Sequence, residues 1–335
     1  MLPPLATSSG FRPIPSRTQR VFEFLLWAGL VLAATTVWAG VPQAKLGLSY
    51  PVGGPGMPQP TCLYVDAHRG EIYVADATSS RVVIFDRHGR YDFEFKTAGR
   101  LNGLRQVVAD SLGRILVLGD PREHTLAQYD YNGDFLRYLD LYYPGTDSLL
   151  DVASMALDGR DQLYLLCARP AHIYVYTACG AYTGDFPIFE EMDSETQESP
   201  VPGTLAVIDQ MLVIPLPMDA QVARYTMDGK LDDIIGMMGG GPGELSFPVA
   251  VIGNGRGGMY VLDKHRHTVL EYDRAGNYLR EFGGLGQSVG WFYHPTTLAV
   301  SADGLCLVGQ TFQNRVQAML IQEPAGTTGL STTNP

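Results

Sequence analysis

The sequence predicts an all-β protein, a six-bladed β-propeller of four-stranded antiparallel blades whose ring is closed by an N-terminal strand. Three observations carry this prediction. Short apolar strands alternate with Gly, Asn and Asp turns along most of the chain. The same pattern returns at spacings of 44 to 49 residues. The last copy lacks one strand, and an unassigned strand stands near the N-terminus.

The clearest copy spans residues 247–282. Its four strands are predicted at residues 249–252, 259–263, 268–272 and 277–282. Gly, Asn and charged residues separate the strands, as is typical of antiparallel hairpins. A single four-stranded sheet cannot bury both of its faces, so this unit needs neighbours of the same kind.

An aromatic residue followed four positions later by Gly marks the repeat. The five pairs are Phe85 with Gly89, Tyr129 with Gly133, Tyr176 with Gly180, Tyr225 with Gly229, and Tyr272 with Gly276. The Gly is predicted to supply a positive φ in the turn between the third and fourth strands. The aromatic side chain is predicted to pack between neighbouring sheets. Another 47 residues lead to Met319 in a sixth, three-stranded copy.

These marks divide residues 40–321 into six predicted blades. Their approximate bounds are 59–103, 104–149, 150–199, 200–246, 247–293, and 294–321 together with the strand at 44–53. The N-terminal strand should complete the last sheet, which removes an open edge. Residues 322–335, rich in Gly, Thr, Ser and Pro, are predicted to be disordered.

The first 39 residues are predicted to be a signal peptide. A basic lead (Arg12, Arg17 and Arg20) precedes an apolar run over residues 24–39, which ends Val-Trp-Ala with small residues at −3 and −1. An uncleaved anchor over residues 21–39 is the alternative. Either way the chain is predicted to be exported, to the periplasm or the extracellular space.

The charge of the chain argues against nucleic acid as a partner. The formal net charge is −11, and the first 39 residues contribute +2, which leaves −13 for the remainder. Non-specific nucleic-acid binding depends on neutralising phosphates with Lys and Arg, so this is the wrong sign.

Two stretches carry a resemblance to a known family. They read GGPGELSFP, GGMYVLD and VLEYDRAGNYLREFG within residues 240–283, and GEIYVADATSSRVVIFDRHGRYDFEF over residues 70–95. With these motifs the chain resembles exported, bacterial-type NHL-repeat six-bladed β-propeller proteins. The resemblance covers about residues 44–321 and is most specific in blades 1 and 5.

The resemblance also implies two kinds of enzyme. Peptidyl-amidating lyases of this type bind zinc through His residues just after the Pro that begins a blade, where this chain has Thr61, Val249 and Thr296. Lactonase-type propellers need acidic and Asn residues around calcium in the channel, and the predicted inner strands offer none. We therefore assign no catalytic residue, metal or cofactor, and predict a non-catalytic binding or scaffold protein. A metal-dependent lyase or lactonase-type enzyme with a channel site is the alternative.

One loop face is predicted to be basic. In a propeller the loops after the second and fourth strands of each blade share a face. That face would hold Arg81, Arg122, His124, Arg169, His172, Lys264, His265, Arg266, His267 and Arg315. Only Glu123 and Asp219 stand against them in these loops. This pattern predicts a protein partner or an anionic ligand, with an ordinary solvated loop face as the alternative.

Three smaller features complete the candidates. Residues 190–198 form an acidic insertion that would lie on the same face, where it would fold over the basic residues, recruit a basic partner, or stay a solvated loop. His265 and His267 alternate in a short loop, a weak zinc pattern without a third ligand. Gly253, Gly255 and Gly258 match a dinucleotide-binding spelling, but no helix follows, so they indicate a turn.

The four cysteines are predicted to be mainly structural. Cys167 and Cys179 are expected at opposite ends of one blade, too far apart for a disulfide. Cys62 and Cys306 are expected on neighbouring sheets, where a disulfide is geometrically possible, but buried free thiols are the expected state.

Overall fold

The structure is a computed structural model that describes residues 43–45, 48, 56, 58–97, 99–120, 124–190, 201–301 and 303–321. The predicted signal peptide and C-terminal tail lie outside the described residues, as do Arg122 and residues 191–198 of the acidic insertion. Among the described residues, no helix has the length and apolar character needed to cross a bilayer.

The first three sheets each consist of four consecutive antiparallel strands. The first is β2 (Pro60–Val65), β3 (Ile72–Asp76), β4 (Arg81–Phe85) and β5 (Tyr91–Lys96). The second is β6 (Gln106–Ala109), β7 (Ile115–Leu118), β8 (Leu126–Tyr129) and β9 (Phe135–Leu139). The third is β10 (Val152–Leu157), β11 (Gln162–Ala168), β12 (Ala171–Thr177) and β13 (Tyr182–Pro187). We refer to these sheets as blades 1, 2 and 3.

Blades 4 and 5 repeat the same order, and blade 6 differs in its fourth strand. Blade 4 is β14 (Ala206–Ile208), β15 (Met211–Leu216), β16 (Gln221–Thr226) and β17 (Leu231–Ile235). Blade 5 is β18 (Pro248–Gly253), β19 (Met259–Asp263), β20 (Thr268–Tyr272) and β21 (Tyr278–Gly283). Blade 6 is β22 (Thr297–Val300), β23 (Leu305–Gln310) and β24 (Arg315–Leu320), joined by β1 (Gln43–Lys45).

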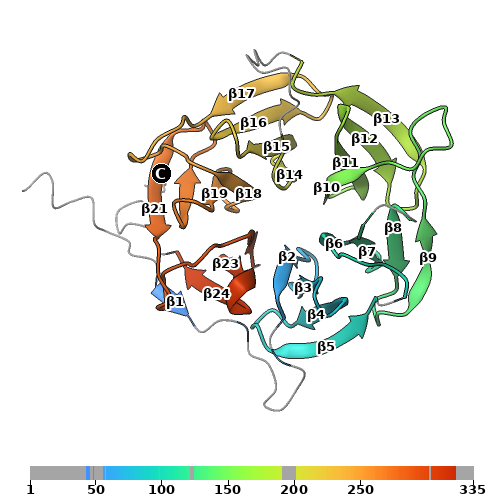
Figure 1. Cartoon of the computed structure of the whole chain (residues 1–335), viewed down its shortest axis with the longest axis horizontal. Coiled ribbons are helices and arrows are strands. Elements are labelled where there is room, and N and C mark those ends of the chain that lie inside the picture. The colour runs from blue at the N-terminus through green and yellow to red at the C-terminus, as the bar shows by residue number, and fades with distance from the viewer. Residues whose placement is uncertain are drawn as a thin grey trace, which may run out of the picture. The chain divides into compact units, whose positions relative to one another are not determined.

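The six sheets surround a common centre, which confirms the predicted all-β six-bladed propeller. Figure 1 shows β2, β6, β10, β14 and β18 nearest the centre, and β5, β9, β13, β17 and β21 along the rim. A separate cluster of buried apolar side chains fills each junction between neighbouring blades, including the junction of blade 6 with blade 1. In that last cluster Leu307 and Val316 of blade 6 meet Val74 and Phe85 of blade 1.

The N-terminal strand β1 pairs antiparallel with β24, with Ala44 opposite Met319. It is shorter than the predicted strand at residues 44–53, because residues 46, 47 and 49–53 lie outside the described part of the chain. That this strand holds the ring closed stays a prediction, which a truncation can test.

The repeat residues have the predicted structural roles. The five aromatic residues and Met319 are all buried, and each exposes 5% of its surface or less. All five repeat glycines have φ between 75° and 89°. An L-residue is strained at such angles, so the turn after the third strand depends on Gly at this position. The sequence period therefore reports directly on interblade packing and turn geometry.

Candidate binding face

The candidate basic residues lie in the loops after the second strands or at the first residues of the third strands. The antiparallel order of each blade places these loops at the same end as the loops that lead into the next blade. Arg122 lies outside the described residues. The other nine differ in how their charge is compensated.

Arg81 is a structural residue of blade 1. Its side chain is 4% exposed, and it forms ion pairs with Asp76 at 3.1 Å and Glu94 at 2.8 Å. Its Nη2 also donates to the carbonyl of Gly56 at 2.9 Å. Asp76 in turn accepts the backbone N–H of Ser79, so this carboxylate also caps the loop after β3. Arg81 is therefore neutralised inside the protein.

The two histidines of blades 2 and 3 also have acidic neighbours. His124 Nδ1 lies 3.0 Å from Asp140, and its ring stacks on Tyr138 with centroids 3.5 Å apart. His172 Nε2 lies 2.6 Å from Asp185. Partial burial acts to raise the pKa of Asp185, but hydrogen bonds from Tyr182 and His172 lower it on balance. This carboxylate is thus held ionised beside the imidazole.

Arg266 of blade 5, like Arg81, forms an ion pair with a fourth-strand carboxylate and donates to backbone carbonyls. Its Nη2 lies 2.6 Å from Glu281, while Nη1 donates to the carbonyls of Gly241, at 2.8 Å, and Glu244. Because Gly241 and Glu244 belong to the loop entering blade 5, the guanidinium joins that loop to β21.

Acids outside these loops compensate several of the basic residues, which a count of Glu123 and Asp219 within the loops did not reveal. Glu94, Asp185 and Glu281 occupy one equivalent position on the fourth strands of blades 1, 3 and 5. Each stands two residues before the cross-strand partner of an equivalent third-strand residue, namely Arg81, His172 or Thr268. Diagonal neighbours across antiparallel strands lie within reach of long side chains. These acids could have been found by aligning the third and fourth strands of each blade in register, because they do not lie in the loop sequences.

Three described cations are not compensated by a described carboxylate. Lys264 and Arg169 form no ion pair with a described residue, and Arg169 is exposed. Arg315 donates to the carbonyls of Gln287 at 2.8 Å and Trp291 at 3.4 Å, and to Gln310 Oε1 at 3.2 Å. Burial lowers the pKa of Arg315. Guanidinium nevertheless stays protonated in proteins, so its charge meets only neutral oxygens here.

His265 and His267 have different surroundings despite their closeness in sequence. His265 is exposed and stacks on Phe247, with centroids 4.3 Å apart. His267 is 8% exposed, has φ of 58°, and its Nδ1 accepts the backbone N–H of His294 at 3.2 Å. Burial, with the nearby His294 and His265, lowers the pKa of His267. The described residues contain no group of three or more His, Cys, Asp or Glu side chains arranged to hold a metal ion.

The same face carries exposed apolar side chains that sequence reasoning missed. Seven large apolar residues in the loops of blades 4, 5 and 6 are exposed, from 49% for Trp291 to 73% for Phe312. We call them the blade 4–6 patch: Met218, Met237, Met238, Leu285, Val289, Trp291 and Phe312. In the described loops of this face over blades 1 to 3, Tyr142 is the comparable residue, and Val201 lies between blades 3 and 4.

Several residues of the patch occupy equivalent positions of the sequence repeat. Met218, His265 and Phe312 stand 47 residues apart, each second in the loop after a second strand. Met238 and Leu285 are also 47 residues apart, each in a loop that joins two blades. Aligning these loops by the repeat would have revealed the apolar positions. Their exposure would still have been hidden, because Met and Leu also form cores.

Buried anchors hold the connecting loops in place. Leu245 and Phe292 are fully buried at equivalent positions, and each forms an isolated parallel bridge, with Met238 and Leu285 respectively. Trp291 packs on Gly284 and Gly286 so closely that a Cβ on either would lie within 2.9 Å of its side chain. The patch is therefore presented on loops with a defined conformation.

The central channel has a different character. The first strands of all six blades line a cavity of about 160 Å³ with mainly aliphatic side chains. Gln106 Oε1 accepts the N–H of Met155, Thr297 Oγ1 accepts that of Leu63, and Arg105 donates to the carbonyl of Val152. The polar groups of the channel wall thus bind neighbouring inner strands.

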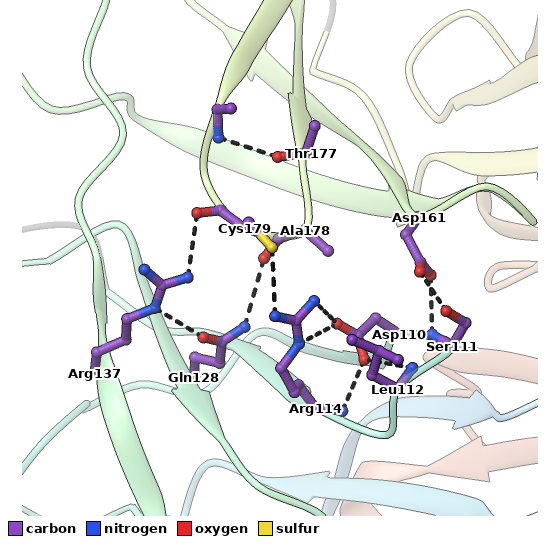
Figure 2. A network of polar contacts seen from close by, with 11 residues as sticks. Asp110, Ser111, Leu112, Arg114, Gln128, Arg137, Asp161, Thr177, Ala178 and Cys179 are labelled. Carbon is purple, nitrogen blue, oxygen red and sulfur yellow. Dashed lines mark hydrogen bonds and ion pairs between the residues drawn. The ribbon is translucent and has the colours of Figure 1, made fainter.

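The opposite face carries a polar network between blades 2 and 3. Figure 2 shows Arg114 against Asp110, at 2.6 Å, and donating to the Cys179 sulfur at 3.3 Å. Arg137 donates to the Cys179 carbonyl at 3.2 Å, so side chains of blade 2 reach a turn of blade 3. These contacts join turns of adjacent blades and involve none of the candidate residues.

All four cysteines are free thiols in the structure. Cys62, Cys167 and Cys306 are buried and Cys179 is exposed. Burial raises the pKa of Cys62 to about 11 and that of Cys167 to about 12. The geometrically possible bridge between Cys62 and Cys306 is not formed, in agreement with the expected buried free thiols.

Comparisons with known proteins identify the fold. No protein-family model and no curated protein sequence matches the chain. A solved auxiliary nutrient binding protein from Bacteroides ovatus is 17% identical, with a TM-score of 0.62, covering 85% of this chain and 77% of that one. A streptogramin B lyase is 13% identical, with a TM-score of 0.55, covering 85% and 99%. The virginiamycin B lyase of Staphylococcus aureus is 12% identical, with a TM-score of 0.55, covering 82% and 84%. At these identities the likeness shows the six-bladed propeller fold alone.

Proposed function

We propose that this chain is an exported, non-catalytic binding propeller with NHL-type repeats that recognises a protein partner through the loop face of blades 4 to 6. The observation that carries the proposal is the blade 4–6 patch, seven exposed apolar side chains on the loops of three neighbouring blades. Exposed apolar groups that gather on one face of a soluble domain mark interaction sites. Export is proposed from the basic and apolar pattern of residues 1–39.

The construction of the loops supports a binding role. Leu245 and Phe292 anchor the two connecting loops in the core, and Arg266 and Arg315 bind their backbone carbonyls. A surface that is already ordered loses little conformational entropy when a partner binds. Solved nutrient-binding proteins share the fold, which is consistent with a propeller that binds rather than transforms its ligand.

A pull-down from native envelope extract tests the proposal. Wild-type protein is compared with a Met238→Ser/Phe312→Ser double variant and with a Leu112→Ser/Tyr131→Ser control. Leu112 and Tyr131 are also exposed, at 70% and 65%, but lie in loops of the opposite face. We expect a partner that wild type and control retain and the double variant loses. An identical set of proteins from all three would disprove binding through this face.

The lyase or lactonase alternative requires a metal, and metal analysis of the purified protein tests it. Zinc or calcium retained at one equivalent per chain after dialysis would favour the enzyme. No contact in the described channel adds support to that alternative.

A further inference from the structure

We propose that the blade 4–6 patch binds an extended polypeptide segment in which apolar side chains are flanked by carboxylates. This inference rests on the proposed function and specifies the chemistry of the partner. Two properties of the face support the inference: the repetition of its apolar positions, and the two cations that lie beside them without a described carboxylate partner.

The apolar positions repeat from blade to blade. Met218 and Phe312 are equivalent residues of blades 4 and 6, with the His265 ring at that place in blade 5. Met238 and Leu285 are equivalent residues of the two connecting loops. A surface that repeats along one direction suits a ligand that repeats as well, and an extended chain presents side chains at regular intervals. Met side chains also adapt to apolar groups of different shape.

Rings extend the apolar character of the patch. His265 stacks on Phe247, and at the equivalent place in blade 6 Phe312 contacts His294 with centroids 5.8 Å apart. His294 in turn contacts Tyr293 and the buried His267. The exposed rings of His265 and Phe312 thus each pack against a second ring of the protein, which favours contact with a partner's apolar side chains.

Two cations of blades 5 and 6, Lys264 and Arg315, lie in the loops that carry the apolar positions and form no ion pair with a described carboxylate. Lys264 has no described acidic partner, and Arg315 is bound only by neutral oxygens. Of the nearby carboxylates, Glu281 pairs with Arg266, whereas Glu244 and Asp263 accept backbone N–H groups, from Gly241 and Ser246 respectively, each at 2.6 Å. Carboxylates of a partner would therefore find complementary charge beside the apolar positions.

The overall charge favours a polypeptide over a membrane as the occupant. With a net charge of −11, the chain as a whole is repelled by an anionic bilayer. A bilayer surface faces many of these charges at once, whereas a short acidic and apolar segment meets mainly the groups within about 8 Å, the screening length at physiological salt. Membrane binding is an outcome that the experiment can detect.

Fluorescence anisotropy with three labelled peptides of equal length tests the inference on the full chain. The probe alternates Leu or Phe with Glu, the second peptide has Lys for Glu, and the third has Ser for Leu and Phe. We expect saturable binding of the probe, at least about tenfold weaker binding of the other two, and loss of affinity as salt rises.

Variants locate the binding. Phe312→Ser with Met238→Ser should weaken binding of the probe about tenfold, as hot-spot truncations do. Lys264→Ala should weaken it about threefold and reduce its salt dependence. Leu112→Ser and Lys230→Ala, exposed residues of the opposite face, should leave it unchanged. Equal binding of all three peptides, or an equal loss in the opposite-face variants, would overturn the inference.

Two further measurements separate this inference from the proposed function. If the envelope partner depends on the patch but the probe peptide does not compete with it, the inference fails while the binding function stands. Cosedimentation with vesicles of phosphatidylglycerol and phosphatidylcholine, lost in the Phe312→Ser/Met238→Ser variant, would assign the patch to a membrane and overturn the polypeptide.

Discussion

Blade 1 and blade 6 place an arginine at the same position, and the two arginines have different roles. Arg81 and Arg315 each begin a third strand, five residues after the last residue of the second strand. Arg81 meets Asp76 and Glu94, whereas Arg315 meets the amide of Gln310 and two backbone carbonyls. The first is a neutral structural unit, and the second leaves a positive charge beside exposed apolar side chains.

This comparison extends to the whole loop face. Over blades 1 to 3 the described basic groups are mainly paired with acids, and the loops are largely polar. Over blades 4 to 6 the loops carry the blade 4–6 patch together with Lys264 and Arg315. The same repeat therefore builds both halves, and the difference lies in side chains that the fold does not require. Such positions are where a binding function is placed on a scaffold.

The largest effect is expected at the buried anchors of the patch. Phe292→Ala should lower the free energy of unfolding by about 3–5 kcal/mol, because it removes a fully buried ring from the core between blades 5 and 6. Phe312→Ala, at an exposed position, should change it by less than about 0.5 kcal/mol. Urea unfolding measures both. Similar losses for the two variants would show that Phe312 is not a surface residue.

The two equivalent arginines provide the next comparison. Arg81→Met should cost about 3 kcal/mol, because the buried carboxylate of Asp76 loses its partner. Arg315→Met should cost about 1 kcal/mol, since only hydrogen bonds to neutral oxygens are lost. Equilibrium unfolding at pH 7 ranks the two. An equal or larger cost at Arg315 would argue that its charge is compensated in the native protein.

Removal of β1 tests the predicted closure of blade 6. A chain that starts at residue 46 loses the pairing with β24, and we expect it to be less stable by roughly 2–3 kcal/mol, at about 1 kcal/mol for each backbone hydrogen bond. A chain that starts at residue 40 is the control, because it removes only the predicted export segment. Equal thermal stability of the two truncated chains would contradict the closing role of this strand.

The smallest effect concerns pH. In the folded protein the pKa of His267 lies below its ordinary value of about 6.5. As the pH falls below 6.5, the unfolded chain therefore binds a proton at this residue more readily than the folded chain does. Its contribution to stability is therefore present above that pH and is lost as the pH falls. The groups around it are Asp263, which opposes this shift, and His265 and His294, which add to it.

His267→Asn should reduce the loss of stability on acidification. Asn tolerates the positive φ of this position, and Asn314 occupies the equivalent place in blade 6 with φ of 48°. Melting temperatures at pH 7.5 and 5.5 should differ less for the variant than for the wild type. A parallel decrease in both proteins would assign the acid sensitivity to other groups.

The fold could be predicted because the residues that mark the repeat act on the backbone and packing close to them in sequence. Gly in the turn and an aromatic residue four positions earlier occur in five copies, and each copy has the predicted φ and burial. The site could be predicted only in part. The loops that share one face follow from strand order, but the acids that neutralise Arg81, His172 and Arg266 lie on other strands and depend on register.

The sequence by itself determined the number of blades, the strand order and the face on which the basic residues lie, because period and turn chemistry are local properties of the chain. Only the tertiary structure decided which charges are neutralised and which apolar residues are exposed. Both depend on contacts between segments that lie on different strands or loops. The residue type alone does not show whether a Met or Phe is buried in a core or exposed on a surface. Arg81 and Arg315 show this most directly, since the same residue at the same repeat position has a different electrostatic environment in each blade.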